Sequence, residues 1–223
     1  QTKTWSNFVT ALTAFIQGKS DPRGLRIRVL MGTITSPTIA AQMRKLQTLF
    51  PNLVWHQYDP IGQANANAGV ELSFGQPLTP IYDFAKARRI LSLDADFLSD
   101  LSGSVRYARE FAQRRRFAFE AIGPVDALAV DPVVPQPTAD TFSRLYVAES
   151  TVTITGARAD HRLAVKTSDI AAIAALFADP SRATHLSSAA RAWASAAMDD
   201  LRQAGSDALI IAGENQPPQV HAI

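Results

Sequence analysis

The sequence predicts an α/β fold built on a doubly wound, mainly parallel sheet with helices on both faces. Short apolar runs alternate with amphipathic segments in the βαβαβ order that produces parallel sheets with right-handed crossovers. Residues 90–93 are almost entirely apolar, as expected of a strand that is buried on both faces of such a sheet. The expected strands lie near residues 26–31, 53–58, 89–94, 144–148 and 207–212.

The first half of the chain contains three expected helices. The opening helix follows Thr4, whose hydroxyl suits the N-cap position. A second helix is capped by Ser36 and begins at Pro37, and a third ends at Gly75, a residue that favours helix C-termini. The apolar residues of the opening helix recur at helical spacing, at Trp5, Phe8, Leu12, Phe15 and Ile16.

The second half contains three further expected helices and one interruption. The helices cover residues 104–119, a segment capped by Ser168, and residues 186–203. The β-branched residues 152–155 favour an additional strand. Prolines and acidic residues break every period between residues 123 and 140, so we predict an inserted surface loop there.

The C-terminal residues 216–223 place prolines where a helix begins and apolar residues where its inner face continues. The chain stops within about one turn of that start, since an α-helix has roughly 3.6 residues per turn. We therefore interpret residues 1–223 as a single α/β domain that is a fragment of a longer chain.

The composition excludes several classes of function. With 223 residues and 47% hydrophobic residues, the chain can bury a substantial core. Its net charge of +2 provides no strong field for nucleic acid, and no apolar run approaches the roughly 20 residues of a membrane helix. Cysteine is absent, which excludes disulfides, thiolate metal sites and iron–sulfur ligation within these residues. We expect neither a nucleic-acid partner nor direct membrane insertion.

The candidate site residues follow from the expected sheet, because open α/β sheets bind ligands at the carboxyl ends of their strands. Asp94 and Asp96 lie where the central strand ends, and they either stabilise the following turn or bind a cation or a ligand hydroxyl. Ser36 and Thr38 begin a helix, where they either cap it or hold an anion. Gly213 directly follows the last expected strand.

The sequence identifies no catalytic or metal-ligating residue. The four histidines have no spacing that places two ligands on one helical face, and no Gly-x-Gly-x-x-Gly, Walker lysine or Gly-x-Ser-x-Gly motif is present. His161 follows Asp160 and is either oriented by that carboxylate or a neighbouring arginine, or simply exposed. Residues 114–116, three arginines at a helix end, either complement the helix dipole or bind a partner carboxylate.

Six segments, taken in order, span nearly the whole chain apart from the loop around residues 123–138, and they are residues 35–38, 55–60, 87–98, 144–150, 156–163 and 213–222. Together they resemble the molybdopterin-oxidoreductase-like region of the large iron–sulfur subunit of bacterial alternative complex III, a quinol:cytochrome c oxidoreductase. The specificity lies in the ordered set, since no single motif is diagnostic.

The resemblance implies a domain with the fold of the molybdenum enzymes that carries no molybdopterin. It also implies that iron–sulfur clusters lie in a separate Cys-rich region of the full-length chain. No catalytic residue of the family matches a position in this sequence. The expected partners are cytochrome c-type and integral membrane subunits of a respiratory complex, at the periplasmic face of the bacterial inner membrane. The alternative is a pterin- or nucleotide-binding catalytic domain of a molybdenum oxidoreductase, with its ligand beside the five crevice candidates.

Overall fold

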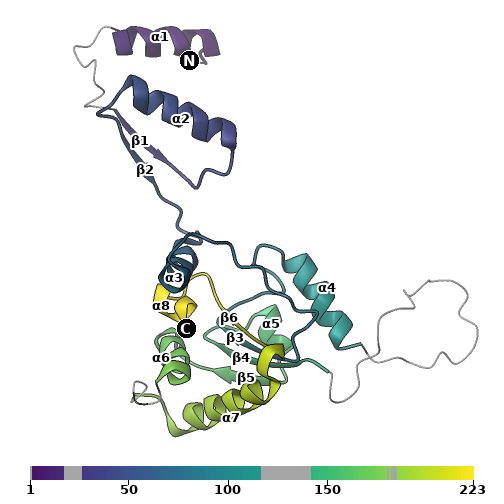
Figure 1. The fold of residues 1–223 in the computed structure, drawn as a ribbon. Coiled ribbons are helices and arrows are strands. Elements are labelled where there is room, and N and C mark those ends of the chain that lie inside the picture. The colour runs from purple at the N-terminus through teal and green to yellow at the C-terminus, as the bar shows by residue number, and fades with distance from the viewer. Residues whose placement is uncertain (1, 18–26, 117–141, 180, 182–184) are drawn as a thin grey trace, which may run out of the picture. The chain divides into compact units, whose positions relative to one another are not determined.

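The computed structural model describes residues 2–17, 27–116, 142–179, 181 and 185–223 (Figure 1). The expected inserted loop at residues 123–140 lies outside these described residues. The chain divides into two compact units, Gln1–Gly62 and Gln63–Ile223. The single α/β domain expected from the sequence over residues 1–223 stays a prediction.

The first unit contains α1 (Trp5–Gln17), β1 (Arg28–Met31), α2 (Pro37–Leu49) and β2 (Val54–Gln57). β1 and β2 pair in parallel as a two-stranded sheet. Both predicted caps are confirmed: Thr4 Oγ1 accepts a hydrogen bond from the Asn7 N–H at 3.3 Å, and Ser36 Oγ accepts one from the Ile39 N–H at 3.4 Å. Pro37 occupies the start of α2, where its missing N–H costs no helical hydrogen bond.

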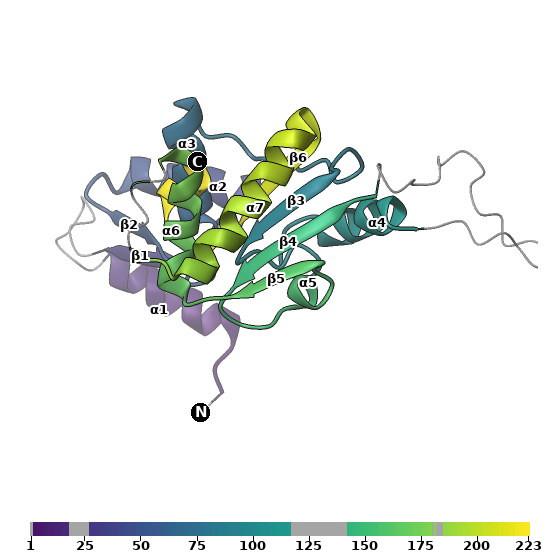
Figure 2. The same cartoon turned by 90° about the horizontal axis from the view of Figure 1, so that it is seen from below.

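The second unit is built on a four-stranded sheet in the order β5-β4-β3-β6, and every neighbouring pair is parallel (Figure 2). Gly75 ends α3 with φ +68°, a conformation that glycine adopts without steric cost. The elements of this unit are α3 (Ala64–Phe74), β3 (Arg89–Leu93), α4 (Ser104–Arg114), β4 (Arg144–Glu149), α5 (Ile154–Ala157), β5 (His161–Ala164), α6 (Thr167–Ala178), α7 (Ser188–Ala204), a short 3₁₀ turn η2 (Gly205–Asp207), β6 (Ala208–Ala212) and α8 (Pro218–Ala222).

Apolar clusters lie on both faces of this sheet, because successive side chains of a strand point to opposite faces. Leu91 and Leu93 of β3 contribute to the cluster beneath α6 and α7. Ile90 of the same strand contributes to the other cluster, together with Tyr107 and Phe111 of α4. The parallel α/β class and the helices on both faces are therefore confirmed for this sheet.

The strands are divided between two sheets rather than joined in one. No residue of β1 or β2 is fully buried, since β1 alternates between exposed and partly exposed residues and three of the four residues of β2 are exposed, whereas four of the five residues of β3 are buried. An apolar run signals a strand but does not identify its neighbours, which depend on how loops bring strands together.

Two local predictions in the second unit are wrong, and one strand was missed. Residues 152–155 form no strand: Thr153 Oγ1 accepts a hydrogen bond from the Gly156 N–H at 2.9 Å and caps α5. Ser168 is not a cap, because α6 begins at Thr167 after Lys166. The four-residue strand β5 was not predicted, since its mostly exposed sequence lacks an apolar run.

Candidate functional site

The carboxyl ends of β3 and β6 define the candidate site. The chain leaves β3 through α4 and returns as β4, which pairs with one side of β3, while β6 pairs with the other side of β3. Such a reversal in strand order creates the position at which open α/β sheets bind ligands. The structure brings Asp94, Asp96 and Gly213 together at this edge.

Asp94 joins the loops that follow β4 and β6. Its Oδ1 accepts hydrogen bonds from the Ser150 N–H at 3.1 Å and the Ser150 hydroxyl at 3.4 Å, and its Oδ2 accepts one from Gln216 Nε2 at 3.0 Å. The Gln216 side chain is buried. Asp94 has φ +57°, a left-handed conformation that aspartate tolerates better than most residues.

Asp96 supports the start of α5. Its Oδ1 accepts hydrogen bonds from the Thr155 N–H at 3.0 Å and from the Thr155 hydroxyl at 2.6 Å. Thr155 is fully buried, and its Oγ1 in turn accepts the Leu98 N–H at 3.2 Å. Asp96 therefore satisfies an otherwise unpaired helix N-terminal N–H from a distant part of the chain.

A serine that the sequence analysis did not single out stabilises the turn after β3. The Ser92 hydroxyl donates to the Ala95 carbonyl at 2.7 Å and accepts the Ala95 N–H at 3.2 Å. Ser92 is completely buried, so these bonds satisfy a polar group that would otherwise be costly inside the sheet. Asp94 and Asp96 are thereby left to bind neighbouring loops rather than their own turn.

Gly213 closes the edge between β3 and β6. Its N–H donates to the Leu93 carbonyl at 2.9 Å, and a Cβ at this position would lie 2.0 Å from the Asp94 carbonyl oxygen. No side chain fits there, so glycine is required by close backbone approach. The backbones occupy the space directly between these two strand ends.

Ser36 and Thr38 belong to the first unit, separately from the other candidates. The Ser36 hydroxyl caps α2, as its simpler interpretation requires, and Thr38 lies in the first turn of that helix. Thr33 Oγ1, in the preceding loop, donates to Asp59 Oδ2 at 3.0 Å. The Thr33 and Ser36 hydroxyls therefore serve local structure.

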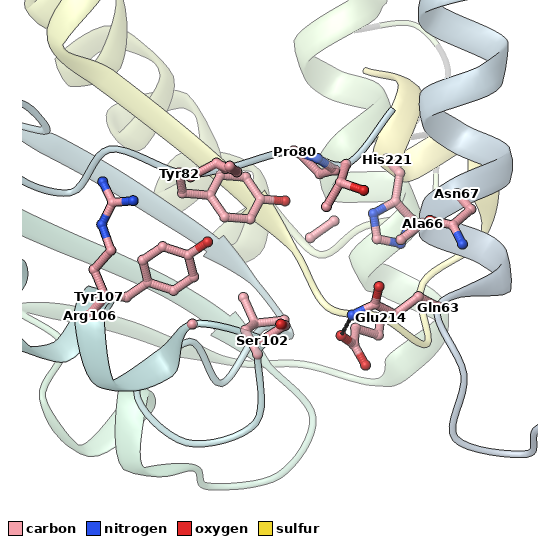
Figure 3. A pocket seen from close by; sticks show the side chains of 15 residues that line it. Gln63, Ala66, Asn67, Pro80, Tyr82, Ser102, Arg106, Tyr107, Glu214 and His221 are labelled. Carbon is pink, nitrogen blue, oxygen red and sulfur yellow. Dashed lines mark hydrogen bonds between the residues drawn. The ribbon is translucent and has the colours of Figure 1, made fainter. Parts of the chain in front are cut away.

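A pocket of about 350 Å³ lies beside the closed edge, within the second unit (Figure 3). Its walls come from α3, residues 79–82, the start of α4 and the segment after β6. The polar side chains include Tyr82, Tyr107 and Glu214. Gln63 Nε2 donates a hydrogen bond to Glu214 Oε1 at 2.8 Å.

Two ionisable side chains of this pocket, Tyr82 and His221, have pKa values shifted mainly by burial. Burial raises the pKa of Tyr82, and the nearby Tyr107 and Glu214 raise it further. Burial lowers the pKa of His221 more than its backbone hydrogen-bond acceptors and Glu214 raise it. At neutral pH the Tyr82 phenol and the His221 imidazole are therefore both uncharged.

Comparison with known proteins gives no assignment for this site. No protein-family model matches the chain, and no curated protein matches it either. Across the described ranges, no group of three or more His, Cys, Asp or Glu side chains could hold a metal ion. No helix among the residues that the structure describes is long and apolar enough to cross a membrane.

A buried carboxylate at the end of β4 was not predicted. Glu149 is 1% exposed, and its Oε1 accepts a hydrogen bond from Arg162 Nε at 2.5 Å while its Oε2 accepts one from the Thr153 hydroxyl at 2.7 Å. A Cβ on Gly156 would lie 1.9 Å from Glu149 Oε1. The Glu149–Arg162 ion pair joins residues 144–150 to residues 156–163, two of the segments on which the family resemblance rests. The spacing of residues in the sequence does not predict such a pair.

Of the three arginines at the end of α4, Arg114 lies in the last turn, where its charge complements the helix dipole, and its Nε donates to the Ser143 hydroxyl at 3.4 Å, whereas Arg115 binds a carboxylate of this chain. Arg115 forms a two-pronged ion pair with Asp160, with nitrogen–oxygen distances of 2.5 and 2.8 Å. Asp160 Oδ2 also accepts the Leu145 N–H at 2.8 Å. His161 is exposed, one of the interpretations left open by the sequence, and it stacks on Tyr146 with ring centroids 4.8 Å apart.

Proposed function

We propose that the chain is a cofactor-free, molybdopterin-oxidoreductase-like scaffold domain of an iron–sulfur subunit in a respiratory quinol:cytochrome c electron-transfer complex. The family resemblance motivates the proposal, and the parallel α/β architecture is compatible with it. The observation that carries the scaffold role is the internal use of the carboxylates at the sheet edge. Asp94 and Asp96 bind Ser150, Thr155 and Gln216 rather than facing an empty crevice.

The energetics support a structural role for these carboxylates. Asp94 accepts three hydrogen bonds and Asp96 accepts two. Hydrogen bonds to charged groups contribute about 1.5–3 kcal/mol each. A ligand at this edge would have to replace them and would also meet the backbone at Gly213, where even a Cβ does not fit. Holding loops in place is therefore the simplest role of the site.

The remaining parts of the proposal follow from the resemblance. The redox centres would be iron–sulfur clusters in another region of the full-length chain, and this domain would hold none. Its partners would be cytochrome c-type and integral membrane subunits, on the periplasmic face of the bacterial inner membrane. The domain would contribute to an oxidoreductase complex without catalysing a step itself.

One observation favours the alternative, a pterin- or nucleotide-binding catalytic domain. The pocket of about 350 Å³ lies beside the switch in strand order, and its volume falls within the usual range for small-molecule sites. Molybdenum and pterin analysis of the purified full-length protein separates the two proposals. A near-stoichiometric content assigned to this domain would support the alternative and contradict the scaffold role.

The decisive experiment uses the complete complex. Asp94→Asn and Asp96→Asn should lower the melting temperature, because each removes a charge from a set of charge-assisted hydrogen bonds worth about 1 kcal/mol or more. Quinol:cytochrome c activity per assembled complex should stay within about twofold, since no step passes through these groups. The control is Asp199→Asn, an exposed carboxylate on α7.

A loss of activity without a loss of stability in either variant would contradict the scaffold role. If either variant assembles with unchanged melting behaviour but loses activity by about a hundredfold, roughly 2.7 kcal/mol of barrier, the carboxylate takes part in the reaction. The scaffold proposal would then be wrong. An equal loss in the Asp199→Asn control would instead show that the assay responds to surface charge alone.

A further inference from the structure

Glu214 carries a charge that its neighbours do not balance. It follows Gly213 directly, is half-buried and lines the pocket beside the sheet edge. Its Oε1 accepts a hydrogen bond from Gln63 Nε2 at 2.8 Å, and this donor is neutral. Among the described residues, no lysine, arginine or histidine forms an ion pair with Glu214. A carboxylate in such a position favours a cationic ligand.

Two basic side chains line the pocket, and neither supplies that cation: burial lowers the pKa of His221 more than Glu214 raises it, and Arg106 is bound to another carboxylate. Arg106 lines the wall, but its Nε donates to Glu110 Oε1 at 2.6 Å. Asp83 also raises the Arg106 pKa, so two carboxylates already act on this guanidinium. In Figure 3, Tyr82 and Tyr107 lie on the side of the pocket nearer Arg106, while Glu214 lies on the other.

The tyrosines supply acceptors and an apolar surface. Their rings are 5.9 Å apart and nearly perpendicular, and Figure 3 shows both hydroxyls directed into the pocket. A protonated phenol oxygen accepts hydrogen bonds, and the ring attracts cations through its quadrupole. Leu101 and Ile81 add apolar wall, so the pocket combines one charged end with a largely apolar interior.

We propose that this pocket binds a small organic cation, with an ammonium group that donates hydrogen bonds to Glu214 and a hydrocarbon part that packs against Tyr82 and Tyr107. The carboxylate sets the sign of the ligand's charge, because a charge-assisted hydrogen bond is about twice as strong as a neutral one. The inference is independent of the scaffold proposal, since such a ligand is neither a redox centre nor a pterin.

The test uses the full chain and three probes of matched size: butylammonium, 1-butanol and butyrate. Binding is followed by shifts of the backbone amide signals in nitrogen–proton NMR spectra. Butylammonium should shift the signals of Glu214, Gln63 and Tyr107 in a saturable way, whereas 1-butanol and butyrate should bind at least tenfold more weakly. Binding of 1-butanol or butyrate as tight as that of butylammonium would overturn the proposal.

Two variants assign the site. Glu214→Gln keeps the shape of the side chain and should weaken butylammonium binding at least tenfold, and Tyr82→Phe should weaken it severalfold by removing one acceptor. The control is Glu71→Gln, an exposed carboxylate on α3 outside the pocket. Unchanged affinity in Glu214→Gln, or an equal loss in Glu71→Gln, would overturn the proposal. If Glu214→Gln does not fold, Tyr82→Phe and the three probes decide.

Discussion

At Gly156 the backbone passes so close to the buried Glu149 carboxylate that no side chain fits. A Cβ would lie 1.9 Å from Glu149 Oε1, which also binds Arg162. Gly156→Ala should therefore lower the free energy of unfolding by about 1–3 kcal/mol, the usual cost of overpacking, although alanine favours helices over glycine.

Urea unfolding measures this effect. The matched control is Gly32→Ala, where a Cβ meets no atom within 4 Å and the change should stay within about 0.5 kcal/mol. A loss at Gly156 no larger than that of the control would show that the Glu149–Arg162 pair moves freely, and that its buried geometry is not a constraint on the fold.

His221 makes the stability of the second unit depend on pH. Burial is the largest cause of its lowered pKa. Because the unfolded chain has the ordinary value near 6.5, it binds more protons than the folded chain below that pH. The contribution is thus fully present above about pH 6.5 and is lost as the pH falls from there toward the lowered folded value.

The prediction is that the free energy of unfolding decreases on acidification below about pH 6.5, and that His221→Gln flattens this decrease. Chemical denaturation at a series of pH values measures both curves. Parallel curves for the two proteins would contradict the assignment, because the pH dependence would then arise elsewhere in the chain.

The positions of single candidate residues were easier to predict than their partners. Asp94 and Asp96 follow a buried strand, so sequence alone places them at the edge of the sheet. Their contacts with Ser150 and Thr155 join residues more than fifty positions apart, and such contacts depend on loop paths that periodicity does not encode. The pocket residue Glu214 was missed because, of the residues that follow the last strand, only the adjacent Gly213 was taken as a candidate for the ligand-binding edge.

Among the elements, α7 covers one face of the four-stranded sheet through a partly buried tryptophan. Trp193 packs edge-to-face on Tyr146 of β4, with ring centroids 5.9 Å apart and planes at 76°. Trp193→Ala should lower the free energy of unfolding by about 2–4 kcal/mol, below the full range for a buried tryptophan because the side chain is partly exposed.

The control for this substitution is another tryptophan. Trp5 on α1 is 78% exposed, so Trp5→Ala should change stability by less than about 0.5 kcal/mol. Denaturation followed by circular dichroism compares the two variants. If they lose equal stability, the contact of α7 with the sheet contributes little.

Elements with strong local signals were predicted well, and two short elements without such signals were not. The caps Thr4 and Ser36 and the terminal Gly75 were all identified, because each has a local side-chain or backbone reason to end a helix. The four-residue elements α5 and β5 were missed although the equally short β1 and β2 were predicted, because β-branched residues favoured a strand at 152–155 and the sequence of β5 lacks an apolar run. Tertiary hydrogen bonds, such as the one from the Thr155 N–H to Asp96, decide the conformation there.

At the scale of the whole molecule, the two units differ in how much core they contain. The buried hydrophobic residues described in the first unit are Met43 and Leu53, whereas the second unit contains two extensive apolar clusters. Because isolated two-stranded sheets are marginally stable, the first unit should open far more often than the second.

Hydrogen exchange measures this difference. Amides of β1 and β2 should exchange at least a hundredfold faster than those of β3 and β4, which corresponds to about 2.7 kcal/mol of opening free energy. All four strands are measured in the same sample, so β3 and β4 serve as the internal reference for β1 and β2. Comparable protection in all four strands would mean that the two units unfold together as one cooperative structure.

The fold class was predictable because alternating strands and helices restrict the chain to parallel sheets. The division of the strands between two sheets was not, since each apolar run is compatible with several neighbours. Function is less predictable than the fold class, because the same α/β fold supports many activities. The proposed role depends on the family resemblance.

The paired strands β1 and β2 have a consequence for the protein in concentrated solution. Within the described residues each has a single partner, so the outer edge of each carries backbone N–H and C=O groups that no strand covers. Such edges act as templates for strands of other molecules and promote fibrillar aggregation. We therefore expect the purified chain to aggregate at temperatures well below that at which the larger sheet unfolds. Its lifetime in solution should then shorten as its concentration rises.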